Sequence, residues 1–277
     1  RCSAIVEVLT SKRAIPAAVL IVFALGAAFW LWLQVAPLNV IVRGGDGPPT
    51  LVLLHGYGGT AESWLQFIGK IQPPGNARLI FPQGPLRGPG SGMRGWWWLD
   101  IRGHIPPGQQ MADFSIANPG GIKVASRLVR NYLKDIAGPI VLGGFSQGAM
   151  VSGEIAFQTD QELAALVLLG GTTVNEAAWV DRFPHRRRLP IFITHGRQDS
   201  VLPFAIAQRF AGKLKAAGLN VTWFPFEGGH EIPSEVVREL NAFLALHVGR
   251  DFRKSAIARS ATAEVPPTGG SKDPPLR

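Results

Sequence analysis

The segment from which the whole chain can be interpreted is Pro139-Ile-Val-Leu-Gly-Gly-Phe-Ser-Gln-Gly-Ala-Met150. Its first part is apolar and β-branched, as in a buried strand, and the residues from Ala149 onward favour a helix. Between them lies the pattern G-x-S-x-G, centred on Ser146. In the order strand, turn, helix, this pattern predicts a nucleophile elbow, in which a sharp turn holds the serine in a strained backbone conformation.

The two glycines of the pattern, Gly144 and Gly148, fit such a turn. Side chains two residues before and after the serine would collide with neighbouring backbone, and glycine has none. The alternative is an ordinary glycine-rich turn with an incidental serine, because G-x-S-x-G alone is common. The rest of the chain therefore has to decide between the two.

Two further residues fit the partners that such a serine needs, a base to take its proton and a carboxylate to orient the base. Asp199 follows a predicted strand at Ile191–Thr194, and His230 lies in a glycine-rich turn after a predicted strand at Asn220–Phe226. The order Ser, Asp, His is the one expected after an elbow, and the carboxyl ends of parallel strands share one edge of a sheet. We therefore predict a catalytic triad of Ser146, Asp199 and His230.

Each partner also has a simpler interpretation. Asp199 alone could be a turn residue before a helix, and His230 alone a solvated loop histidine. His195 is a competing base, but it lies inside the Asp199 loop, and we expect it to support that loop. The order of the three residues, each at a strand end, favours the triad.

An oxyanion formed at this serine needs preorganised hydrogen-bond donors. The backbone N–H of Gln147, directly after the serine, is one expected donor. The second should come from the loop after an early strand, where Leu54-His-Gly-Tyr-Gly-Gly59 offers glycines on both sides of Tyr57. We assign the Tyr57 N–H to this role.

Apolar runs and helical periods alternate from residue 38 to residue 252, which predicts a single α/β domain with a doubly wound, mostly parallel sheet. Predicted helices begin in the elbow and occupy Gly120–Ile136, Phe204–Ala217 and Ser234–Val248. The other predicted strands are Leu38–Val42, Thr50–Leu54, Ala77–Phe81, Pro139–Leu142 and Ala164–Leu169.

Residues 83–119 lack periodicity, and so long a connection is usually functional. The segment contains apolar side chains that could wall a substrate pocket: Met93, Trp96, Trp97, Trp98 and Phe114. The alternative is a hydrophobic cluster packed beneath a long loop.

The N-terminal part predicts a membrane segment. After the tail 1–13, residues 14–36 begin with an apolar run long enough to cross a bilayer as a helix of about 30 Å. Lys12 and Arg13 precede the run, which orients the catalytic domain outside the cytoplasm. A cleaved signal peptide, leaving a secreted domain, is the alternative. At the other end, the polar tail 253–277 is predicted to be disordered.

Composition narrows the partners. The net charge of +9 lies largely in the two tails, and the middle of the 277-residue chain has no basic helix, so nucleic-acid binding is not expected. The single cysteine, Cys2, excludes an intrachain disulfide and a cysteine metal cluster. Oligomeric state cannot be read from these features.

As a set, five motifs resemble the phospholipase/carboxylesterase family of α/β hydrolases, which includes acyl-protein thioesterases: Leu54-His-Gly-Tyr-Gly58, Phe81-Pro-Gln-Gly-Pro85, Gly144-Phe-Ser-Gln-Gly148, His195-Gly-Arg-Gln-Asp199 and Gly228-Gly-His230. The resemblance covers roughly residues 50–248. It implies a serine carboxylesterase that hydrolyses a small-molecule or lipid ester without a cofactor or metal. Two features depart from the family: its soluble members lack the N-terminal span, and Trp98-Leu99-Asp100 matches its Trp-Phe-Asp region only loosely.

Other activities fit the same residues. A thioesterase, a lysophospholipase or an acyltransferase would use the same triad. A catalytically idle, membrane-tethered binding protein with a hydrolase fold is the alternative from another class, and the complete triad argues against it.

Overall fold

The structure is a computed structural model that describes residues 24, 26, 37–88, 90 and 92–263, with side chains as far as Val248. The chain divides into two units, Arg1–Pro37 and Leu38–Arg277, and the second carries the predicted catalytic residues.

In chain order, the described helices and strands of the second unit are β1 (Val40–Gly44), β2 (Gly47–Leu54), the 3₁₀ helix η2 (Ala61–Phe67), β3 (Ala77–Pro82), β4 (Leu86–Arg87), β5 (Arg94–Gly95), η3 (Arg102–His104), α2 (Gly120–Leu133), β6 (Ile140–Phe145), α3 (Gln147–Gln158), β7 (Ala165–Leu169), α4 (Glu176–Val180), η4 (Phe183–Arg186), β8 (Ile191–Gly196), α5 (Phe204–Ala216), β9 (Val221–Phe226) and α6 (Ser234–Ala263). Each of the seven predicted strands is present. The segment 83–119 contains only short elements, as expected.

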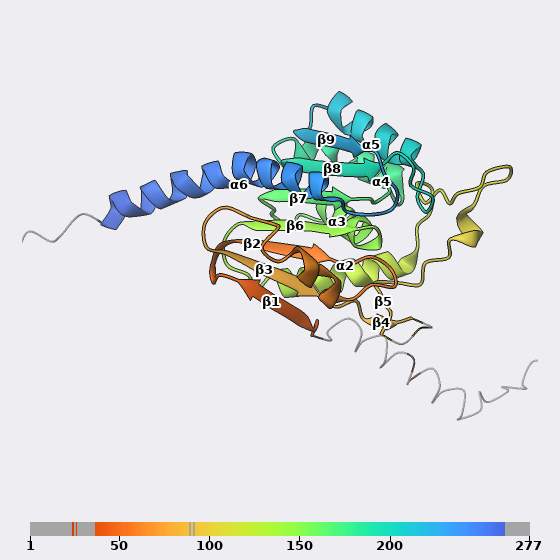
Figure 1. Cartoon of the computed structure of the whole chain (residues 1–277), viewed down its shortest axis with the longest axis horizontal. Coiled ribbons are helices and arrows are strands. Elements are labelled where there is room, and N and C mark those ends of the chain that lie inside the picture. Colours follow the sequence, from red (N-terminus) through yellow and green to blue (C-terminus); the bar gives the residue numbers. More distant parts are fainter. Residues whose placement is uncertain (1–23, 25, 27–36, 89, 91, 264–277) are drawn as a thin grey trace, which may run out of the picture. The chain divides into compact units, whose positions relative to one another are not determined.

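The centre of this unit is a seven-stranded sheet in the order β1-β3-β2-β6-β7-β8-β9 (Figure 1). Only β1, at the edge, runs antiparallel to its neighbour, and the other pairs of this sheet are parallel. All parallel strands therefore end at the same edge of the sheet, and the turn after β6, which carries Ser146, lies beside the ends of β7 and β8. The predicted mostly parallel, doubly wound fold is confirmed.

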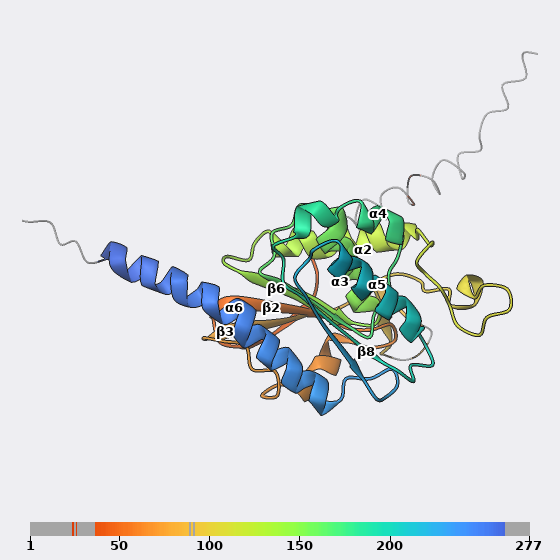
Figure 2. The same cartoon turned by 90° about the horizontal axis from the view of Figure 1, so that it is seen from above.

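Helices cover both faces of the sheet (Figure 2). Alternate residues of one strand enter different cores: Val52 and Leu54 pack with α2, α3 and α5, whereas Leu51 and Leu53 pack with η2 and α6. A strand buried on both faces has to be apolar at nearly every position, which explains why the strands read as continuous apolar runs.

The last helix, α6, corrects one prediction. It continues to Ala263, and its second half extends beyond the sheet (Figure 1). The segment 253–263, predicted to be disordered, is rich in alanine, arginine and lysine, which favour helix, and the first proline after it is Pro266. The rest of that tail lies outside the described residues.

The predicted membrane segment, 14–36, also lies outside the described residues, except for Ala24 and Gly26. Among the helices that the structure describes, none combines the length and the apolar character that crossing a bilayer requires. The span therefore stays a prediction.

Candidate active site

The turn between β6 and α3 has the geometry of a nucleophile elbow. Ser146 has φ 54° and ψ −117°, a left-handed conformation that residues other than glycine rarely adopt. Its N–H donates a 2.9 Å hydrogen bond to the Leu169 carbonyl of the neighbouring strand β7. The strained conformation is thus fixed by sheet hydrogen bonding, and the serine side chain projects where the parallel strands end.

Close packing explains the glycines on either side of the serine. A Cβ on Gly144 would lie 2.5 Å from the carbonyl carbon of Gly148, and one on Gly148 would collide with the Leu54 carbonyl oxygen. The elbow therefore requires glycine at both positions, as the sequence predicts.

The three predicted triad residues meet. The Ser146 hydroxyl donates to Nε2 of His230 at 2.9 Å, and Nδ1–H of His230 donates to Oδ2 of Asp199 at 2.7 Å. They come from three separate strand ends, after β6, β8 and β9. This chain of hydrogen bonds is the arrangement in which an imidazole can take a serine proton and a carboxylate can stabilise the imidazolium.

Asp199 is fully buried and saturated with donors. Its Oδ1 accepts hydrogen bonds of 2.8 Å from the N–H groups of Val201 and Leu202, and its Oδ2 faces both His230 and His195. Burial opposes ionisation, but hydrogen bonds from His195, His230 and the Leu202 N–H outweigh it and hold the pKa of Asp199 well below its usual range. The triad carboxylate is therefore ionised at neutral pH.

His195 is not an alternative base. It is completely buried, and its Nε2–H is shared between Asp199 Oδ2 and the Leu202 carbonyl, each 3.1 Å away. The other ring nitrogen, Nδ1, has no partner among the described residues. The ring therefore carries its proton on Nε2, where it supports the aspartate loop.

The two predicted oxyanion donors come from the turn that carries the serine and from the loop after β2. The Gln147 N–H is the first of helix α3, and no hydrogen bond to it or to the Tyr57 N–H is found in the described part of the chain. Gly56, next to Tyr57, lies against Ser146, since a Cβ added to it would be 3.2 Å from the serine Cβ. Gln147 directly follows the serine, Tyr57 directly follows a residue that adjoins it, and the role of their amides as oxyanion donors stays a prediction.

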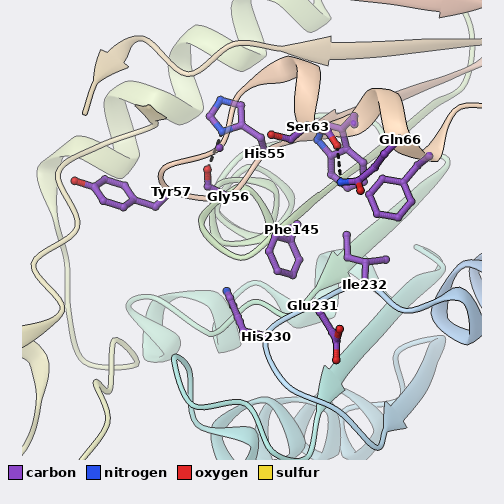
Figure 3. Close-up of a pocket in the computed structure, with 12 residues that line it drawn as sticks. His55, Gly56, Tyr57, Ser63, Gln66, Phe145, His230, Glu231 and Ile232 are labelled. Atoms are coloured by element: carbon purple, nitrogen blue, oxygen red, sulfur yellow. Dashed lines mark hydrogen bonds between the residues drawn. The ribbon is translucent and has the colours of Figure 1, made fainter. Parts of the chain in front are cut away.

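A cavity of about 420 Å³ lies beside the triad histidine. Figure 3 shows the loop 55–59, here called the oxyanion loop because it carries Tyr57, facing Phe145 and the segment His230–Ile232 across the cavity. Its walls also include Trp64 and Phe67 of η2, and polar groups come from Ser63, Gln66 and Glu231. Phe145 packs against the ring of His230, with centroids 4.8 Å apart. This mixed lining is typical of a small-molecule site.

The predicted pocket residues are elsewhere. Trp96, Trp97 and Phe114 are buried in the core with α2 and α3, Trp98 is 63% exposed, and Met93 packs in the β4–β5 hairpin beside Gly88. None of them lines the cavity beside His230, and a cluster beneath the long loop describes the buried ones better. Their role as a pocket wall stays a prediction. Apolar composition alone cannot distinguish a cavity wall from core.

Sequence reasoning misses η2, which supplies the apolar wall instead. A signal was present, because Ala61, Trp64, Leu65 and Ile68 follow the i, i+3, i+4, i+7 spacing of a helix. The pattern covers only the eight residues 61–68, in a segment that otherwise has the composition of a loop.

A serine elbow, a buried Asp–His pair and a mostly parallel α/β sheet together define a serine hydrolase of the α/β-hydrolase class. The model of the phospholipase/carboxylesterase family matches residues 38–248, and the chain belongs to that family.

Individual relatives agree with this assignment. The acyl-protein thioesterase 1 of Gibberella zeae is 26% identical over 76% of this chain and 95% of its own length. That of Yarrowia lipolytica is 28% identical over 65% and 82%. The fold is shared with crystal structures of esterase PE8 (TM-score 0.63, 23% identity, 76% of this chain and all of that one) and of Zea mays acyl-protein thioesterase 2 (TM-score 0.59, 24% identity, 74% and 99%).

Proposed function

We propose that this chain hydrolyses carboxylic esters through an acyl-enzyme formed on Ser146. The observation that carries the proposal is the continuous hydrogen-bond chain from the Ser146 hydroxyl through His230 to Asp199, with distances of 2.9 and 2.7 Å. Nε2 of His230 is placed to accept the serine proton, and the ionised Asp199 holds the ring so that Nε2 faces the hydroxyl.

The reaction follows from these contacts. As Ser146 Oγ attacks the ester carbonyl, its proton passes to His230 Nε2, and the negative charge develops on the former carbonyl oxygen between the Tyr57 and Gln147 amides. His230 then gives the proton to the departing alcohol, which leaves the acyl group on Ser146. A water molecule, deprotonated by His230, releases the acid and restores the hydroxyl.

The cavity supports an acyl-binding role. Trp64, Phe67, Phe145 and Ile232 give it apolar walls, and its lining includes His230 and the oxyanion loop. A volume of about 420 Å³ is in the range of small-molecule sites, which bury a short or medium acyl chain. Each buried methylene would add about 0.8 kcal/mol of binding.

Thioester hydrolysis is the second candidate, and lysophospholipid hydrolysis would use the same groups. The thioesterase is favoured by the curated relatives, which include the acyl-protein thioesterase 1 of Gibberella zeae. The same triad and oxyanion donors serve both chemistries, because the attacked group is a carbonyl in each case. Oxygen and sulfur esters of one acid therefore have to be compared directly.

The test uses p-nitrophenyl esters and alkyl thioesters of the same graded acids. We expect the wild type to hydrolyse esters, and Ser146→Ala to lose at least about 10³-fold in kcat. A fluorophosphonate probe should label the wild type and leave Ser146→Ala unlabelled. Absence of both turnover and labelling in folded wild-type protein would reject the enzyme in favour of a binding protein, and faster turnover of thioesters would favour the second candidate.

We also propose, on the sequence alone, that residues 14–36 tether the catalytic domain outside the cytoplasm. A reporter fused after Phe252 should be active only in an extracytoplasmic location. A cytoplasmic reporter signal would reject the orientation, and release of the domain by alkaline carbonate would reject the tether.

A further inference from the structure

The tryptophan-rich segment contacts both halves of the oxyanion hole. Residues 94–97, here called the tryptophan strap, run beside the loop that carries Tyr57. The Gly58 N–H donates to the Arg94 carbonyl at 2.8 Å, and the Arg94 N–H donates to the Gly59 carbonyl at 3.2 Å. This pair of backbone hydrogen bonds fixes the loop directly after the Tyr57 amide.

Trp96 extends the contact to the residues on each side. Its indole N–H donates to the His55 carbonyl at 2.8 Å, two residues before Tyr57. Its backbone N–H donates to the side-chain Oε1 of Gln147 at 2.9 Å. The indole N–H of Trp96 therefore binds the oxyanion loop. Its backbone N–H binds Gln147, whose own amide is the other oxyanion donor.

The side chain of Gln147 completes this arrangement. Its Nε2 donates to the Trp97 carbonyl at 2.8 Å, so both polar atoms of the side chain are bound to the strap. Gln147 is completely buried and Trp96 is 2% exposed. Hydrogen bonds in such surroundings are stronger than in water, and a fully satisfied buried network is rigid.

His55 anchors the loop from its other side. Nδ1–H of its ring donates to the Gly56 carbonyl, and Nε2 accepts from the Gly84 N–H at 2.9 Å. The ring is neutral in this arrangement, and burial lowers the pKa of His55 in agreement with it. The Tyr57 ring points away from the cavity (Figure 3) and would be 2.9 Å from a Cβ placed on Gly95 of the strap.

We propose that Trp96 is a positioning residue for the oxyanion hole, holding the Tyr57 and Gln147 amides at the spacing that a tetrahedral oxyanion needs. The proposal rests on the proposed function, since it assumes that these two amides act at Ser146. It also gives the buried strap a role other than walling a pocket. Misplacing such donors by about 1 Å costs up to about 10²-fold in rate.

The test compares two tryptophans that are equally buried. Trp179 is 1% exposed, and its indole N–H also donates at 2.8 Å to a buried acceptor, Glu154. It makes no contact with the triad or the oxyanion amides. Trp96→Phe and Trp179→Phe therefore lose the same kind of hydrogen bond, one beside the oxyanion hole and one away from it.

We expect Trp96→Phe to lower kcat for a p-nitrophenyl ester about 10- to 100-fold, with KM within about twofold of the wild type. An alkyl boronic acid, which adds to Ser146 Oγ and places a charged oxygen in the oxyanion hole, should lose affinity by a similar factor. Trp179→Phe should lower the unfolding temperature yet keep kcat and boronate affinity. Gln147→Met, which keeps the backbone amide but removes both side-chain hydrogen bonds, should behave as Trp96→Phe does.

Other outcomes would overturn the proposal. These are wild-type kcat in both Trp96→Phe and Gln147→Met, a loss of kcat with unchanged boronate affinity, equal losses in Trp179→Phe, or failure of both site variants to fold, which would make the contacts purely structural. An inactive, unlabelled wild type would instead reject the proposed function itself.

Discussion

Nε2 of His195 lies 3.1 Å from Oδ2 of Asp199, the same oxygen that receives the Nδ1–H of His230. Two imidazoles thus share one carboxylate oxygen, although only one of them reaches the serine. A buried hydrogen bond to a charged group is worth about 1.5–3 kcal/mol, so the second histidine contributes substantially to the position of Asp199.

The first prediction concerns this contact. His195→Phe keeps a ring but removes the donor, so Asp199 is held less firmly. We expect kcat to fall about tenfold with little change in KM, as measured by steady-state ester hydrolysis. His195→Gln, whose amide can donate from nearly the same place, should recover part of the loss. Equal losses in both variants would contradict a role for the N–H.

The second prediction uses the lowered pKa of Asp199. Because its pKa is depressed in the folded protein, the ionised carboxylate stabilises the fold above the unfolded-state pKa of about 3.9. That stabilisation is lost as the pH falls through the lower native pKa. The difference in unfolding temperature between the wild type and Asp199→Asn should therefore be constant from about pH 7 to 5 and shrink below about pH 4.

Activity gives a second readout for the same variant. We expect Asp199→Asn to lose about 10⁴-fold in kcat at neutral pH, because the amide favours the wrong tautomer of His230. A temperature difference that grew toward acid pH would show that the carboxylate is not the group responsible.

The third prediction concerns the elbow glycines. A methyl group on Gly148 would meet the Leu54 and His55 carbonyl oxygens, so Gly148→Ala should lower the free energy of unfolding by about 3 kcal/mol. Gly212 lies inside α5 with no atom within 4 Å of an added Cβ, and Gly212→Ala should raise it by about 1 kcal/mol. Urea titration would measure both. A stable Gly148→Ala protein would mean that the elbow can relax.

The fourth prediction locates the acyl chain. Ile232 lines the cavity, and Ile232→Trp should fill part of it. We expect the kcat/KM for octanoyl esters to fall at least about tenfold more than that for acetyl esters, since each excluded methylene is worth about 0.8 kcal/mol. Ile68→Trp, at an exposed residue directly after η2 that does not line the cavity, should leave the acyl preference unchanged. Equal effects on both esters would place the chain elsewhere.

The meeting of Ser146, Asp199 and His230 could be predicted from the sequence because each of them follows a local signal. A nucleophilic serine needs glycines around it, and Asp199 and His230 each follow an apolar strand directly. Parallel strands then bring those three ends together without any further information. The sequence pattern and the topology are therefore enough to place these residues.

The cavity could not be placed in the same way. Trp96 and Trp64 are equally apolar, and both are 2% exposed, yet one braces the oxyanion loop and the other lines the site. Which one faces the empty space depends on how the segment 83–119 packs over α2 and α3, and no periodicity records that packing. Helix α6 passes its predicted end for a related reason, since alanine-rich polar sequence is compatible with either state.

Both proposed oxyanion donors belong to the main chain, so no substitution other than proline can delete either of them. Most substitutions act only on the side chains around these amides. A relative could therefore keep the serine, aspartate and histidine and still lose activity through changes at positions 96 or 147. The residues at these two positions would help to distinguish active relatives from inactive ones that still have all three triad residues.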